Sequence, residues 1–210
     1  MAGTITGFKS QKRAKMRVNV YLDEQFAFGL AVIHATQLQV GQWLSDEAIA
    51  ALQSADEVER AREYALNYLS YRPRSVAEMQ RHLLKHGFGA DAVTTVLQGL
   101  QRVGLVDDVA FAQYWVDNRA RFRPRGRRAL VQELMQKGIS AQTIEIALAE
   151  YDETVAAQQV AEEQGRRLAH LPPDMFRRRL TQRLARRGFS YALIQEVLST
   201  YTFPDSGDDF

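Results

Sequence analysis

The sequence lacks several features that would narrow its function at once. It contains no cysteine among 210 residues, which excludes disulfide bonds, thiol catalysis and cysteine-ligated zinc sites. No apolar run approaches the roughly 18 residues of a membrane-spanning helix, and the N-terminus has no signal-peptide core, so we expect a cytoplasmic protein. The chain also lacks a large excess of either positive or negative charge, because its formal net charge is only +2. Any electrostatic attraction for nucleic acid must therefore come from local clusters.

Signatures of catalysis are equally scarce. There is no Walker-type loop, no glycine-rich phosphate cradle after a strand, and no local Ser/His/Asp grouping. Glu78, His82 and His86 share one predicted helical face, which is a possible metal-ligand spacing. Internal repetition argues against that reading, since the position of His82 is occupied by Glu133 and Arg183 in the other copies described below. We interpret this position as a solvated, mostly basic face, and we expect no enzyme activity, no cofactor and no metal site.

What the sequence does contain is a repeat centred on three glycines, Gly87, Gly138 and Gly188. Apolar residues recur at the same five distances from each glycine, in a pattern that continues the helical period of 3.6. These columns are Met79, Leu130 and Leu180; Leu83, Leu134 and Leu184; Phe88, Ile139 and Phe189; Val93, Ile144 and Ile194; and Leu97, Leu148 and Leu198. A period of about 50 residues predicts a tandem array of units that mostly contact their neighbours.

The middle copy shows how each unit is built. We expect a first helix from Asp107 to about Phe122, capped by the carboxylates of the Asp107–Asp108 pair. Pro124 ends it, and a second helix runs from about Gly126 to Lys137. Gly138 is suited to a left-handed C-cap, and Ser140 can cap a third helix. Helices this short are unstable alone, so the three must pack together.

We therefore predict a mainly α fold, an elongated tandem array of three helix-turn-helix-like repeats behind a small β-containing segment. Alternating side chains predict strands over 4–8, 15–22 and 25–30, with a turn at Asp23 and Glu24. A short helix is expected over 32–39, and another from Ser45 to about Ser54. The expected divisions are a β-rich extension, three three-helix repeats and an acidic tail, over residues 1–55, 56–104, 105–152, 153–204 and 205–210.

The middle repeat also carries a resemblance to a known family. The stretch GLVDDVAFAQYWVDNRARFRPRGRRALVQELMQKGIS, residues 104–140, closely resembles the middle repeat of the RecX family of bacterial RecA modulators. The resemblance covers residues 57–203 well and the N-terminal segment more loosely. It implies tandem three-helix repeats, no catalysis, and negative regulation of recombination and the SOS response. The implied mechanism is binding in the groove of the RecA–DNA filament, which inhibits its ATPase, strand-exchange and coprotease activities.

Arginines are the candidate contact residues. Six fall within ten residues of the middle repeat, and the same region is basic in the other two copies. Together with Tyr68, the candidates are Arg72, Arg74, Arg81, Arg119, Arg121, Arg123, Arg125, Arg127, Arg128, Arg177, Arg178 and Arg183. Guanidinium groups pair with carboxylates or phosphates, and those that open a helix are not explained by its dipole. The alternative is that the arginines cap helix ends and keep the surface soluble, as Arg186 and Arg187 suggest.

Two further interpretations concern nucleic acid. Base-reading helices carry basic or amide side chains, whereas the third helices here hold Asp91, Glu145, Glu150 and Glu196, so we do not expect sequence-specific readout. Most aromatic residues of the first helices, among them Tyr64, Tyr71, Tyr114, Trp115 and Phe122, are expected to pack between helices. The expected partner is the RecA filament, with single- or double-stranded DNA as a further ligand, no membrane contact and a monomeric state. A DNA-binding protein acting without RecA and a helical scaffold for another partner remain alternatives.

Overall fold

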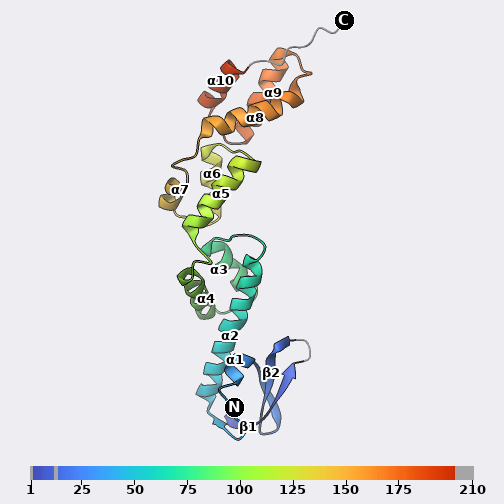
Figure 1. Cartoon of the computed structure of the whole chain (residues 1–210), viewed down its shortest axis with the longest axis vertical. Coiled ribbons are helices and arrows are strands. Elements are labelled where there is room, and N and C mark those ends of the chain that lie inside the picture. The colour runs from blue at the N-terminus through green and yellow to red at the C-terminus, as the bar shows by residue number, and fades with distance from the viewer. Residues whose placement is uncertain (1, 12–13, 202–210) are drawn as a thin grey trace. The chain divides into compact units, whose positions relative to one another are not determined.

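The structure is a computed structural model that describes residues 2–11 and 14–201. The chain divides into two compact units, and Figure 1 labels their helices and strands. The first comprises residues 1–74 and 78–106, and the second comprises residues 75–77 and 107–210. The acidic tail expected over 205–210 lies outside the described residues. Within the described part, no helix combines the length and apolar character needed to cross a bilayer.

The first unit begins with an antiparallel sheet. Strands β1 (Gly3–Gln11), β2 (Ala14–Leu22), β3 (Gln25–Ala31) and β4 (Trp43–Leu44) are ordered β3-β2-β1-β4. The three long strands match the predicted alternation, whereas β4 was not anticipated. Asp23 and Glu24 have φ values of 47° and 68°, so the β2–β3 turn lies where it was expected. One sheet face is buried, and its core consists of Ile5, Val20, Leu22, Phe28, Leu30 and Leu44 together with Ile49 from the helix that follows the sheet.

Two helices accompany the sheet, and one of them corrects the sequence analysis. Helix α1 (Val32–Ala35) is shorter than expected, but α2 (Asp46–Leu69) is far longer. The prediction that this helix stops near Ser54 is wrong. No proline or glycine interrupts the sequence there, and the buried Asp56 fastens the helix to the sheet. Its carboxylate accepts hydrogen bonds from the Ala31 N–H and from Arg17, at 2.8 and 2.7 Å. The expected boundary at residues 55–56 therefore falls inside a helix.

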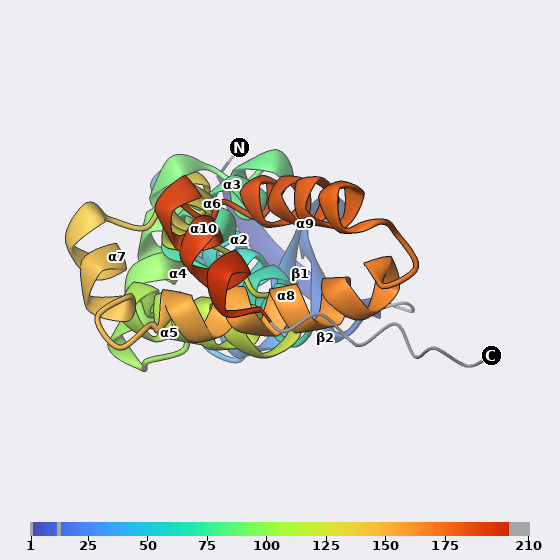
Figure 2. The ribbon, with the colours of Figure 1, turned by 90° about the horizontal axis from the view of Figure 1, so that it is seen from above.

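The remaining helices follow the repeat. The first unit adds α4 (Ala90–Arg102) and most of α3 (Val76–Lys85), whose first two residues belong to the second unit. The second unit contains α5 (Asp108–Phe122), α6 (Arg127–Gln136) and α7 (Ala141–Ala147), followed by α8 (Glu153–Leu168), α9 (Pro173–Arg186) and α10 (Tyr191–Thr200). Helices α8, α9 and α10 lie side by side (Figures 1 and 2). Pro172 and Pro173 start α9 a turn early, so it has 14 residues where α6 has 10.

The predicted core columns are confirmed. All fifteen residues of the five columns are buried, none more than 7% exposed. Gly87, Gly138 and Gly188 have φ values of 82°, 81° and 88°, the left-handed conformation that a Cβ disfavours. This conformation lets the chain leave the second helix and place the next residue in the core. The mainly α, three-repeat architecture with a β-containing N-terminal segment thus matches the prediction.

Helix capping also follows the sequence, with one exception. The Asp107 carboxylate accepts hydrogen bonds from the Val109 and Ala110 N–H groups, and the Ser140 hydroxyl accepts one from Thr143. Asp108 does not cap its own helix. Its carboxylate accepts a hydrogen bond from the Val76 N–H instead, at 2.9 Å. Burial raises the pKa of Asp108, although the hydrogen bond from Val76 opposes the shift.

Two junctions among residues of the second unit share one pattern of contacts. Ser75 and Gly126 both stand twelve residues before the glycine of their own copy. The Ser75 hydroxyl donates to the Lys137 carbonyl at 2.6 Å, and the Gly126 N–H donates to the Arg187 carbonyl at 2.9 Å. Both acceptors directly precede the glycine of the following copy. The start of one second helix therefore meets the end of the next.

The following residue completes each junction. The Val76 N–H donates to Asp108, and the Arg127 N–H donates to the Glu153 carboxylate at 2.9 Å. Asp108 and Glu153 each begin the first helix of the next copy. A carboxylate at the N-terminus of a helix compensates free N–H groups and the positive end of the dipole. Helices α3 and α6 are thus each capped by a side chain from the next copy.

Candidate partner-binding surface

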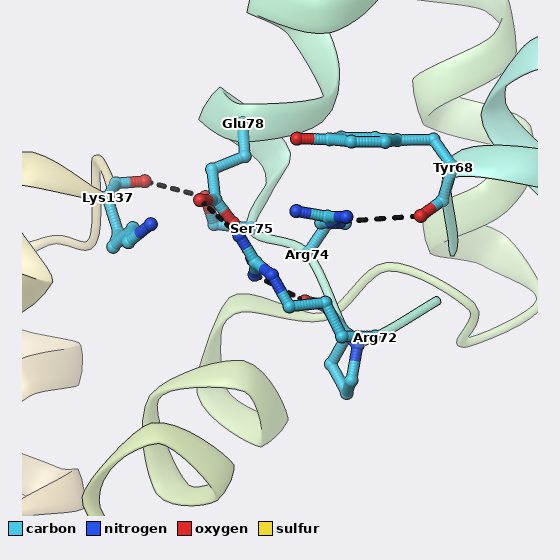
Figure 3. A network of polar contacts seen from close by, with 7 residues as sticks. Tyr68, Arg72, Arg74, Ser75, Glu78 and Lys137 are labelled. Atoms are coloured by element: carbon cyan, nitrogen blue, oxygen red, sulfur yellow. Dashed lines mark hydrogen bonds and ion pairs between the residues drawn. The ribbon is translucent and has the colours of Figure 1, made fainter. Parts of the chain in front are cut away.

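In the first copy, the candidate arginines make contacts within the protein (Figure 3). Arg72 and the buried Glu78 form a bidentate ion pair with distances of 3.0 and 3.1 Å. The Arg74 guanidinium lies 3.7 Å from the centre of the Tyr68 ring, and its Nε donates to the Tyr68 carbonyl. Tyr68, proposed as a surface contact, therefore has one ring face occupied by Arg74. Arg81 is exposed on α3.

The other face of Tyr68 is occupied as well. The His82 ring stacks on it at 3.7 Å with an interplanar angle of 4°. His86 follows at 4.4 Å from His82, and its Nδ1 lies 2.8 Å from the His82 carbonyl oxygen. Partial burial lowers the pKa of His82, followed by the charges of His86, Arg74 and Lys85. Among the described residues no group of metal-ligating side chains converges here.

In the second copy, the position of His82 is occupied by Glu133, whose carboxylate contacts three other side chains. Its carboxylate accepts a hydrogen bond from the Trp115 indole at 2.8 Å and pairs with Arg119 at 2.7 Å. Arg125 lies at 3.6 Å from the other carboxylate oxygen. Arg119 also lies 4.4 Å from the centre of the Trp115 ring. These two candidate arginines link the first helix and the following turn to the second helix.

The third copy uses the same position again. Arg183 donates to the amide oxygen of the buried Gln164 at 2.6 Å. His82, Glu133 and Arg183 are all partly buried and each binds the first helix of its own copy. The interpretation of this column as a solvated, mostly basic face is therefore wrong. The side-chain chemistry changes from stacking to ion pair to amide hydrogen bond, but the contact between helices is kept.

Arg127 is a scaffold residue, meaning that its side chain makes contacts within the protein, whereas its neighbour Arg128 is not. Its guanidinium donates to the Leu148 carbonyl at 2.9 Å and to Glu145 at 3.1 Å. Nearby, the Tyr151 hydroxyl donates to the Arg125 carbonyl at 2.6 Å, and burial raises the pKa of Tyr151 to about 12. Arg128 is exposed and forms no ion pair with the described residues.

The end of α5 carries the other exposed candidates. Arg121 and Arg123 are exposed, with the Arg121 guanidinium 5.2 Å from the Phe122 ring centre. Phe122 is 65% exposed, and Tyr71 at the same place in the first copy is 76% exposed. The expectation that most aromatic residues of the first helices pack between helices is wrong for these two, and Tyr114 is exposed as well. The helix ends at this point, so no neighbouring turn covers the ring. Tyr64 is 47% exposed, but its ring packs against the rings of Phe88 and His86, as expected.

A groove brings exposed arginines of two copies together. It has a volume of about 1020 Å³ and is lined by α6 and by the α9–α10 region of the second unit. Arg128 lines one side, Arg186 and Tyr191 line another, and Tyr191 is 71% exposed. We call Arg128, Arg186 and Tyr191 the arginine groove. Arg177 and Arg178 are exposed on α9 but do not line it.

The chain matches one protein family in four consecutive segments. Residues 3–45 match the RecX N-terminal domain, and residues 61–100, 107–148 and 150–198 match the first, second and third RecX three-helix domains. A regulatory protein RecX of Bacillus licheniformis is 35% identical over 199 residues, which cover 92% of this chain and 76% of that protein. The chain belongs to the RecX family.

Solved RecX structures are similar as well. A crystal structure of a regulatory protein RecX is 29% identical, with a TM-score of 0.72 over 94% of this chain and 99% of that one. RecX from Lactobacillus salivarius is 26% identical, with a TM-score of 0.60 over 69% of this chain and 96% of that one. The RecX protein of Bacillus subtilis is 30% identical over 97% of this chain and 79% of that protein. RecX proteins are regulatory proteins and not a known enzyme family.

RecX membership confirms the resemblance of the middle repeat, but the sequence did not separate scaffold arginines from exposed ones. Arg119, Arg125 and Arg127 are engaged, whereas Arg121, Arg123 and Arg128 are exposed. Sequence reasoning also missed Arg186 and Tyr191, because Arg186 was interpreted as a helix cap. The repeat could have indicated that Arg128 and Arg186 lie close together. Arg128 follows Gly126 by two residues and Arg186 precedes Gly188 by two residues, and Gly126 meets Arg187 at the junction.

Proposed function

We propose that this RecX protein is a cytoplasmic negative regulator of homologous recombination and the SOS response that binds the RecA–DNA filament. It inhibits ATP hydrolysis, strand exchange and coprotease activity by occupying the filament groove, without chemistry of its own. Family membership supports the regulatory role. The resemblance of the middle repeat to the RecX family suggests RecA as the partner. The exposed arginines suit a partner with an acidic or phosphate-rich surface.

The observation that carries the contact assignment is the arginine groove. Arg128 and Arg186 come from successive copies, yet they line one groove of about 1020 Å³. Each guanidinium has five N–H donors in a rigid fork that suits carboxylates and phosphates. Tyr191 adds a flat exposed ring, and the binding energy of interfaces concentrates in tyrosine, tryptophan and arginine. The exposed Arg121 and Arg123 are a second contact region, and Arg81, Arg177 and Arg178 are further proposed contacts.

The test is to add the protein to RecA assembled on single-stranded DNA and to follow ATP hydrolysis and strand exchange. We expect both rates to fall as the protein is titrated. Unchanged rates at saturating protein would remove the proposal.

A DNA-binding protein acting without RecA is the second candidate, because exposed aromatic residues adjoin arginines at Tyr71 and Phe122. It predicts steeply salt-dependent binding to naked DNA that equals binding to filaments. The RecA proposal predicts tighter binding to filaments than to the same DNA without RecA.

A further inference from the structure

The exposed face of the N-terminal sheet differs from the three-helix repeats. Gly7, Lys9 and Tyr21 lie on the sheet face opposite the core residues Ile5 and Val20, as the strand register shows. Lys9 is exposed, and Phe26 on the neighbouring strand is 60% exposed. This face therefore combines aromatic rings, a cation and a strand glycine at adjacent positions.

Gly7 leaves a hollow beside Tyr21. The two residues are cross-strand partners of β1 and β2. A Cβ built on Gly7 would meet no atom within 4 Å, so the Tyr21 ring does not close over it. The hollow has a volume of about 240 Å³, and Lys9 and Glu24 stand at its rim. Sites for drug-sized ligands span roughly 300–1,000 Å³, so this one suits a single flat group.

The chemistry around the hollow matches a nucleotide. The Phe26 ring contacts Tyr21 edge-on at 6.2 Å and 77°, which holds the tyrosine ring in place. The Lys9 ammonium lies over the Tyr21 ring, 4.8 Å from its centre, so a base that stacks on that face displaces this flexible side chain, whose ammonium stays within reach of the phosphate of the same nucleotide. Between Lys9 and Lys15 the sequence holds four basic residues and no acidic one, while Arg17 pairs with Asp56. Single-strand binders combine stacking rings with basic residues that follow the backbone.

We propose that this face of the N-terminal sheet binds single-stranded nucleic acid, with one base over Gly7 against Tyr21 and its phosphate on Lys9. An apolar side chain of a protein partner fits less well, because it would use neither the Lys9 ammonium nor the Glu24 carboxylate at the rim. The Glu24 carboxylate at the rim is an acceptor for an amino group on the edge of a base. The proposal is independent of the RecA proposal, since it concerns no residue of the three-helix repeats.

The experiment is photocrosslinking of the full chain, without RecA, to an oligothymidylate that contains 5-iodouracil. Mass spectrometry then locates the crosslinked residue. We expect crosslinks on Tyr21 or Phe26. Crosslinks confined to residues 57–201, or no crosslink at all, would overturn the proposal whatever the outcome of the RecA assays. The absence of any crosslink is also the result expected if this face binds a protein partner.

Two variants sharpen the test. Gly7→Val fills the hollow without strain, because the space is open and the φ of Gly7 is not positive. We expect an unchanged Tm and at least a roughly fivefold loss of crosslinking, given the usual contribution of one stacked base. Trp43→Ala is the matched control, since it removes a 63% exposed aromatic ring from β4. Wild-type crosslinking at Tyr21 by a folded Gly7→Val variant would refute the assignment.

Discussion

Arg127 and Arg128 are adjacent in sequence, and replacing each by methionine separates scaffold from surface. Arg127 donates to the Leu148 carbonyl and to Glu145, whose side chain is 70% exposed. An exposed ion pair contributes about 0–1 kcal/mol. The hydrogen bond from a charged donor to Leu148 contributes about 1.5–3 kcal/mol, but 39% exposure of Arg127 lets water replace part of it. We expect Arg127→Met to lower the free energy of unfolding by about 1–2 kcal/mol.

Arg128→Met removes the same charge and retains a similar apolar stem, so it controls for both. Surface substitutions usually change stability by less than about 0.5 kcal/mol. In a chain of this size 1 kcal/mol shifts Tm by about 2–4 °C. Thermal unfolding followed by circular dichroism should therefore show a fall of roughly 2–8 °C for Arg127→Met only. Arg128→Met should instead weaken inhibition of RecA. Equal Tm values for the two variants would refute the division into scaffold and surface arginines.

Three further predictions concern stability. Gly87→Ala should lower the free energy of unfolding in urea by about 1–2 kcal/mol, because the φ of Gly87 is 82°, although the space around it is open. Gly99→Ala in the interior of α4 should raise the free energy of unfolding by up to about 1 kcal/mol. Equal effects of the two substitutions would contradict this prediction. Gly126→Ala should raise amide hydrogen exchange at the junction, because its Cβ collides with the Gly188 carbonyl; unaltered exchange would argue against the junction. His82→Phe keeps a ring in the stack but does not titrate. The pKa of His82 is lowered in the folded state, so its contribution is present above the unfolded value and lost as pH falls through the folded pKa. The drop in Tm on acidification from pH about 7.5 to about 5.5 should be smaller in the variant; an equal drop would exclude His82 as the cause.

The repeat was predictable because its causes are local and recur three times. Each copy has buried leucines and a glycine with φ near 80° at the same spacing, so the same residue pattern occurs three times in the sequence. The continuity of α2 was not predictable from propensity, since Asp56 reads as a helix start until its contacts with Ala31 and Arg17 are known. The division among arginines depends on distant acceptors, such as Glu133 and the Leu148 carbonyl, which no sequence spacing reveals.

The most direct test of the central claim compares charge-reversed variants in the RecA ATPase assay on single-stranded DNA. Arg128→Glu combined with Arg186→Glu alters the arginine groove, and Arg62→Glu combined with Arg102→Glu makes the same change on exposed residues elsewhere. Both variants should retain the helical circular dichroism signal. We predict that the groove variant needs at least about tenfold more protein for half-inhibition, as expected for a loss of about 1.4 kcal/mol, while the control behaves as wild type. Wild-type inhibition by the groove variant would contradict the account.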